Sequence, residues 1–215
     1  MSAPNLPVDH LDLVPKARIR EAALAMYAEH GIQRTSIRMV AEAAGMSAGG
    51  VMHHFKSKEA LAESVQNAVL SMIERVVGGV GLASPPDVAA RERREAFDQL
   101  ILDHPDIAGY FRRAQLEGGP AGLALYRESY RLMEAEMREM VDAGLARELP
   151  DPKVALVLYR ALQTAHILLG PLIEEVLDVK MSEPQTLERF RAAVLDLLTR
   201  PVFESAVADD HRGRC

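Results

Sequence analysis

Hydroxyl and cationic side chains gather between residues 35 and 58, where they could bind phosphate groups. Such side chains make most of the hydrogen bonds that proteins form with the phosphates of DNA. Two adjacent imidazoles, His53 and His54, lie in the same stretch and could hydrogen-bond to the edges of bases. The phosphate-binding candidates are Thr35, Ser36, Arg38, Ser47, Lys56 and Lys58. This combination favours nucleic-acid binding over catalysis.

Two short helices joined by a tight turn are expected to position these side chains. Ile37, Val40, Ala41 and Ala44 repeat at the spacing of one helical face. Thr35 or Ser36 can cap this helix, and Gly45 suits the left-handed residue that ends it. Ser47 can cap a second helix, whose inner face carries Val51 and Phe55. The pattern predicts a helix-turn-helix, whose second helix typically enters the major groove of DNA.

The longer stretch of residues 16–61, about a fifth of the chain, resembles the tetracycline-repressor (TetR) family of bacterial regulators. The remaining four fifths resemble the family only in their helical layout. The resemblance is carried by Ile19, Ala22, Ala23, Met26, Tyr27 and Gly31, by Thr35-Ser36-Ile37, by Ala41-Glu42-Ala43-Ala44-Gly45, and by His54-Phe55-Lys56-Ser57-Lys58-Glu59-Ala60-Leu61. It implies a homodimeric regulator that binds double-stranded operator DNA.

The side chains of the second helix that its core does not need should face the DNA groove. They are Ala48, Gly49, Gly50, Met52, His53 and His54. Members of the family usually carry Lys or a polar residue at position 48, Thr at 50 and Tyr at 52. Because this chain lacks those hydrogen-bonding groups, readout should depend on His53, His54, Arg38 and apolar contact with thymine methyl groups. A metal site at the two histidines is disfavoured, since adjacent side chains diverge on a helix.

Composition limits the alternatives. The 215 residues carry a net charge of −6, but residues 1–60 hold seven Lys and Arg against six Asp and Glu, so the acidity lies outside the candidate DNA-binding segment. The one cysteine, Cys215, excludes an internal disulfide framework and a multi-cysteine metal site. No apolar run approaches the roughly 20 residues of a membrane span. We expect a cytoplasmic protein without a metal, cofactor or membrane partner.

Periodicity predicts an all-α chain in four parts: a flexible arm 1–14, a helix-turn-helix DNA-binding domain 15–61, a ligand-binding and dimerisation domain 62–200, and a disordered tail 201–215. A long helix from about Ser57 to Val77 should join the two domains. Prolines near the starts of amphipathic runs suit the first helical turn. The further helices are expected at 86–103, 105–116, 120–144, 152–178 and 184–199, with Pro171 kinking or ending the fourth of these early.

The resemblance implies that residues 80–200 bind an effector and form the dimer. Helices 152–178 and 184–199 have apolar faces too wide for one core, and their interface candidates are Leu158, Leu162, Leu169, Ile173, Phe190, Val194 and Leu197. Burial inside a monomer is the alternative. A pocket is expected to be lined by Tyr110, Phe111, Tyr130, Met133, Met137, Tyr159, Gln163 and His166. These could equally be core residues, or the polar ones could hydrogen-bond across the dimer.

The sequence therefore predicts a repressor that a small-molecule effector of unknown identity releases from a palindromic operator. The alternative is a regulator of the same DNA-binding type that acts as an activator, or that a protein partner controls without a small-molecule pocket. A small helical enzyme is disfavoured, because the sequence shows no nucleophile–base pair, glycine-rich phosphate loop or carboxylate dyad.

Overall fold

The computed structural model describes residues 13–199, and the elements within them are all α-helices. The predicted all-α fold is confirmed. The helices are α1 (Leu13–His30), α2 (Ile37–Ala43), α3 (Ala48–His54), α4 (Lys58–Gly78), α5 (Pro86–Asp103), α6 (Pro105–Glu117), α7 (Gly119–Asp142), α8 (Pro152–Leu168), α9 (Gly170–Leu177) and α10 (Pro184–Thr199). Most of the predicted arm and all of the predicted tail lie outside the described residues. The boundary between the arm and the DNA-binding domain, predicted after residue 14, remains a prediction, and α1 itself begins at Leu13.

Serine caps begin three successive helices of the N-terminal half. The hydroxyl oxygens of Ser36, Ser47 and Ser57 accept hydrogen bonds from the backbone N–H three residues on, at 3.2, 3.0 and 3.0 Å. Each cap satisfies an N–H group that has no partner inside its helix. Gly45 follows α2 at φ +62°, a backbone conformation that glycine adopts without steric cost. The predicted helix-turn-helix is therefore confirmed, with Ser36 rather than Thr35 as the cap of α2.

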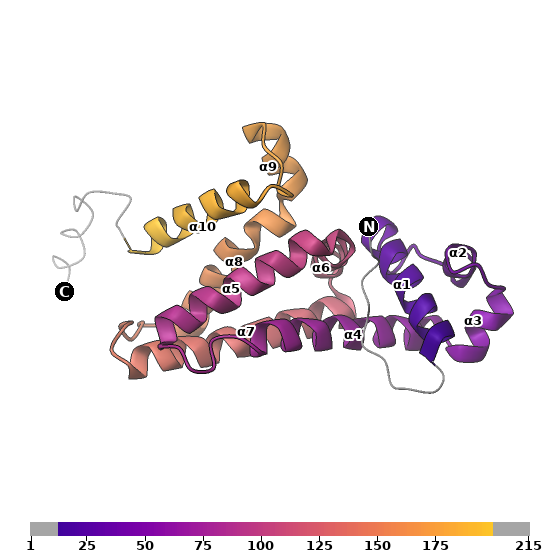
Figure 1. Cartoon of the computed structure of the whole chain (residues 1–215), viewed down its shortest axis with the longest axis horizontal. Helices are drawn as coiled ribbons and strands as arrows, with labels where there is room; N and C mark the ends of the chain where they lie inside the picture. The colour runs from indigo at the N-terminus through magenta and orange to yellow at the C-terminus, as the bar shows by residue number, and fades with distance from the viewer. Residues whose placement is uncertain (1–12, 200–215) are drawn as a thin grey trace, which may run out of the picture. The chain divides into compact units, whose positions relative to one another are not determined.

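A small apolar core holds α1 to α4 together. Its fully buried side chains are Ile19, Leu24, Tyr27, Val40, Val51, Leu61, Val65 and Val69. They come from all four helices, so α2 and α3 rest on a platform made by α1 and the first half of α4. The platform leaves the outer faces of α2 and α3 uncovered (Figure 1).

The chain continues through α4 without a flexible linker into a layer of long helices, in which α4, α5 and α7 lie side by side (Figure 1). The division at residue 61 remains a prediction, since α4 passes through it uninterrupted. Contacts between residues divide the described chain differently, into a unit that ends at Arg160 and a unit that begins at Ala161.

The predicted helix 152–178 is two helices, as Pro171 suggested. α8 ends at Leu168 and α9 begins at Gly170, with a bend of 70° between them. Proline has no N–H and its ring clashes with the preceding turn, so it suits the start of α9. Within residues 13–199 no single helix is long and apolar enough to cross a membrane, and α8 with α9 meets the length and composition only as this bent pair.

Candidate DNA interface and effector region

The outer face of α3 presents small residues and two imidazoles. Ala48, Gly49 and His53 are exposed, and Met52 has 39% of its surface accessible. Gly50 and His54 are half-buried. The His53 and His54 rings lie 5.4 Å apart, edge to face, so their ring nitrogens point in different directions. A partner molecule could therefore come close to the backbone of this face, beside two rings that can form hydrogen bonds.

Three of the predicted phosphate-binding side chains lie exposed around this face. Ser36 and Ser47 use their hydroxyl oxygens as acceptors in the helix caps. Each hydroxyl keeps its hydrogen, which can be donated to a phosphate oxygen. Arg38 is exposed in the first turn of α2.

Thr35 is a correction to the predicted set. Its side chain is 1% exposed, and its hydroxyl donates to the carbonyl of Gly31 at 2.7 Å. The sequence placed it beside Ser36 at the helix start, but the extended backbone at Ser36 turns neighbouring side chains to opposite sides. Thr35 therefore faces inward and stabilises the loop between α1 and α2.

The two lysines flank the start of α4 and both contact backbone carbonyls. The Lys56 ammonium group donates to the carbonyl of His53 at 3.3 Å. The Lys58 ammonium group donates to the carbonyl of Gln33 at 2.8 Å, which ties α4 to the loop before α2. Each ammonium group has three donors, so these bonds leave others for a phosphate.

Tyr110 and Phe111, predicted to line a pocket, lie in contacts between helices instead. Tyr110 is buried against Tyr27 of α1, with 6.4 Å between the ring centroids. Burial raises the pKa of Tyr27 to about 12 and also raises the pKa of Tyr110, because the charged phenolate loses its hydration. Phe111 is buried and packs edge to face on Phe97 of α5, at 6.0 Å.

The other predicted pocket residues are half-buried on α7 and α8: Tyr130, Met133 and Met137 on α7, and Tyr159, Gln163 and His166 on α8. The Tyr159 hydroxyl accepts a hydrogen bond from the guanidinium of Arg94 at 3.5 Å. Gln163 and His166 belong to the second unit, which begins at Ala161.

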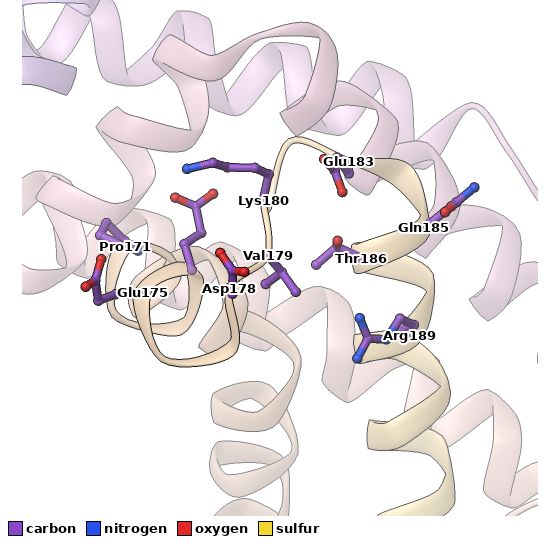
Figure 2. Close-up of a pocket in the computed structure, with 10 residues that line it drawn as sticks. Pro171, Glu175, Asp178, Val179, Lys180, Glu183, Gln185, Thr186 and Arg189 are labelled. Atoms are coloured by element: carbon purple, nitrogen blue, oxygen red, sulfur yellow. The ribbon is translucent and has the colours of Figure 1, made fainter.

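Two cavities lie away from these residues. One, of about 270 Å³, is lined by Leu70, Ile73, Glu74, Glu128, Arg131 and Leu132 of α4 and α7. The other, of about 670 Å³, lies in the second unit between α9 and α10 (Figure 2). Its lining is mostly charged, with Glu175, Asp178, Lys180, Glu183 and Arg189 among its residues. Such a lining does not suit an apolar effector.

One buried arginine on α8 is not predicted by the sequence pattern. Arg160 is 2% exposed and donates to the hydroxyl of Ser129 at 2.8 Å and to the amide oxygen of Gln115 at 2.9 Å. Its guanidinium carbon lies 4.0 Å from the centre of the Tyr126 ring. Burial lowers the pKa of Arg160, because desolvation disfavours the charged form. The sequence signal for it is that Arg160 is the single Asp, Glu, Lys or Arg between Val154 and Ile173.

The predicted dimer residues lie largely on exposed apolar faces. Leu158 is 60% exposed, and Leu162, Leu169 and Leu197 are also exposed. Ile173, Phe190 and Val194 are half-buried. Leu172 and Val176 of α9, which were not among the predicted interface residues, are exposed as well.

Within the described chain no group of three His, Cys, Asp or Glu side chains could hold a metal ion.

Comparison with known proteins gives a family model for residues 19–65, relatives that are similar in sequence, and solved structures that are similar in fold. The family model "Bacterial regulatory proteins, tetR family" matches residues 19–65. The HTH-type transcriptional regulatory protein RaaS of Mycobacterium tuberculosis is 31% identical over 142 residues, 66% of this chain and 64% of RaaS. The HTH-type transcriptional repressor KstR2 of Rhodococcus jostii is 33% identical over 100 residues, 44% of this chain and 48% of KstR2. The chain thus matches less than two thirds of the length of either relative.

A solved structure extends the likeness over most of the fold. FadR of Bacillus subtilis, in complex with stearoyl-CoA, superposes with a TM-score of 0.64 at 15% identity, covering 85% of this chain and 97% of that chain. At this identity the likeness shows a shared fold.

The position of Thr35 leads to a stability prediction. Thr35→Val keeps the shape of the side chain but removes the hydroxyl that donates to Gly31, so the free energy of unfolding should fall by about 1 kcal/mol. Thr35→Ser keeps the hydroxyl that donates the hydrogen bond and is therefore the control. Denaturant unfolding of the three proteins measures the difference. A Val variant as stable as the wild type, but weaker in binding DNA, would return Thr35 to the phosphate contacts.

Proposed function

Because the chain belongs to the tetR family of bacterial regulatory proteins, we propose that it is a transcription regulator that binds a palindromic operator as a homodimer. The single observation that carries this proposal is the capped α2–turn–α3 unit. Its inner face is buried, while Arg38, Ser47, Met52 and His53 remain exposed on its outer side. A helix-turn-helix requires this arrangement, with the inner face packed on the core and the outer face free to contact DNA.

In the proposed complex, the two α3 helices of a dimer enter major grooves about one helical turn apart. The caps of α2 and α3 direct their backbone N–H groups and hydroxyls toward phosphates, while Arg38, Lys56 and Lys58 supply positive charge. The excess of acidic residues beyond residue 60 does not prevent binding, since charges more than about 10 Å apart are largely screened at 0.1 M salt.

Repression is the proposed outcome of operator binding. The similar KstR2 carries the name of a transcriptional repressor, and a dimer seated on an operator can block access to a promoter. We place the protein in the cytoplasm, where bacterial DNA is found. Activation instead of repression would appear as lower transcription of neighbouring genes after deletion of the gene for this protein.

Release of DNA by a small apolar effector is the proposed control. Half-buried Tyr130, Met133 and Met137 on α7 could form an adaptable wall, since methionine fills irregular spaces. FadR, which shares the fold, was solved with stearoyl-CoA, so this architecture can accommodate a long apolar chain. The effector would act only to the extent that it prefers the dimer that does not bind DNA. The alternative remains control by a protein partner without a small-molecule pocket.

We predict that operator binding depends steeply on salt. The operator would first be isolated by mapping bound DNA across the source genome. A dimer that contacts six to ten phosphates should lose roughly a thousandfold in affinity or more between 50 and 200 mM salt. Lys56→Ala should reduce the salt slope and weaken all sequences alike, whereas Lys153→Ala, an exposed lysine on α8, should change neither. An affinity that is flat with salt would contradict the proposed phosphate contacts.

The same assay separates readout of bases from contact with phosphates. His53→Ala should reduce discrimination between the operator and altered operators by about 1–3 kcal/mol, because α3 has few other hydrogen-bonding side chains. Unchanged selectivity in His53→Ala and His54→Ala variants would move readout to Arg38 or to DNA shape.

We predict that Leu169→Glu yields monomers. A charge at an exposed apolar position of the proposed interface should disfavour association, and loss of the second half-site should weaken operator binding by more than about tenfold. Leu82→Glu is the matched control, since Leu82 is 81% exposed outside the proposed interface. Light scattering gives the mass of each variant. If Leu169→Glu remains dimeric, dimerisation does not require an apolar side chain at this position.

We predict that an apolar effector raises the melting temperature and releases the operator. Stearoyl-CoA and a panel of apolar and aromatic compounds serve as probes in both assays. Met133→Trp and Met137→Trp should abolish the response without loss of operator affinity, because the larger ring fills the proposed space. A wild-type protein that no probe stabilises, while its operator binding is intact, would favour the partner-controlled alternative.

A further inference from the structure

The last turn of α6 contacts the end of α1 and the loop 31–36 that leads into α2. Arg113 donates from its guanidinium to the carbonyl of Glu29 at 2.9 Å. The carboxylate of Glu117 accepts a hydrogen bond from the backbone N–H of Ile32 at 3.2 Å. Residues four apart lie on the same face of a helix, so both side chains extend from one side of α6. Arg113 satisfies a carbonyl that the end of α1 leaves without a helical partner, and Glu117 satisfies an N–H group of the loop.

Gly31 makes room for Glu117 at this point. A Cβ atom added to Gly31 would lie only 1.7 Å from Oε1 of Glu117, and the glycine has φ +87°. On the other side of the loop, the carbonyl of Gly31 accepts the hydroxyl and the backbone N–H of Thr35. The loop is therefore held between a carboxylate from α6 and a threonine of its own.

This loop determines where the helix-turn-helix begins. It ends at Ser36, whose hydroxyl caps α2. Its Gln33 carbonyl accepts the ammonium group of Lys58, so the loop also meets the first turn of α4. A displacement of the loop would move the cap of α2, and with it the α2–α3 unit.

The opposite face of the same turn of α6 contacts α8. Gln115 lies two residues from both Arg113 and Glu117, about 200° around the helix. Its amide oxygen accepts a hydrogen bond from Arg160 of α8 at 2.9 Å. α7 packs tightly against the end of α6, because a Cβ added to Gly122 of α7 would lie 2.1 Å from the carbonyl oxygen of Ala114 of α6. The last turn of α6 therefore has little freedom to move independently of α7.

We propose that Glu117 is a positioning residue for DNA binding, and that residues 113–117 couple the Arg160 region to the loop 31–36. This inference rests on the proposed function and deepens it by naming side chains that position the α2–α3 unit. A change that draws Arg160 away from Gln115 shifts the last turn of α6. Glu117 then releases Ile32, and the α2–α3 unit loses its position for the major groove.

The first test compares Glu117→Ala with Glu117→Gln in the full chain. The Ala variant should bind the operator about tenfold more weakly, as expected for loss of one hydrogen bond to a charged group. The Gln variant keeps an oxygen that can accept the Ile32 N–H and should bind within about twofold of the wild type. Glu95→Ala, a change at an exposed carboxylate of α5, is the matched control and should have no effect. Wild-type affinity in the Ala variant would overturn the role of Glu117.

Hydrogen exchange separates positioning from general stability. In Glu117→Ala the amides of residues 31–36 should exchange faster, while the amides of α4 and α7 exchange as in the wild type. Uniformly faster exchange with a lower melting temperature would show a merely structural role and overturn the proposal.

The second test breaks the connection to α8 without touching the loop. Gln115→Ala should accelerate exchange in residues 31–36 and weaken operator binding, and its effect should not add to that of Glu117→Ala. Gln99→Ala, which removes an exposed hydrogen bond to Asp103 on α5, is the control. Unchanged exchange in the loop of Gln115→Ala, or strictly additive losses, would overturn the coupling.

These outcomes distinguish the inference from the proposed function. If the wild-type protein binds no DNA at all, the proposed function fails. The exchange measurements on Glu117→Ala and Gln115→Ala need no DNA and still decide whether α6 controls the loop.

Discussion

The close packing of α1 on α6 is the constraint on which the rest of the structure depends. A Cβ atom added to Gly109 would lie 2.9 Å from the Cβ of Ala28, so the two helices touch almost backbone to backbone. The Tyr27 and Tyr110 rings pack beside this contact, and both side chains are buried. Interiors packed this densely transmit displacements instead of absorbing them. The position of α1, on which α2 packs, is therefore set by α6 as well as by α4.

The proposed recognition helix, α3, gains its order from its surroundings more than from its own sequence. Gly49 and Gly50 each lower intrinsic helix stability by about 1 kcal/mol relative to alanine. The Ser47 cap and the fully buried Val51 offset this cost. The same glycines leave the outer face of α3 nearly flat. A flat face can approach the floor of a groove closely, which suits a protein that reads shape and thymine methyl groups beside a few hydrogen bonds.

The buried Arg160 constrains how α6, α7 and α8 pack together. Arg160 reaches Gln115 on α6 and both Ser129 and Tyr126 on α7 from its position on α8. A buried guanidinium is costly unless polar groups surround it, so the three helices are constrained to the arrangement that supplies them. A change in the surroundings of Arg160 would therefore alter the packing of all three helices.

Local pattern determined the all-α fold, the helix-turn-helix, its caps and the break at Pro171, because helix periodicity, capping serines and proline act within a few residues of themselves. The inward turn of Thr35 and the contact of Tyr110 with Tyr27 were decided only by tertiary structure, since a helical pattern shows which face is apolar but not which neighbour covers it. The bond from Ile32 to Glu117 joins residues 85 positions apart. The residues near Ile32 in the sequence do not predict this bond, because Glu117 lies near the loop only when α6 is packed on α1.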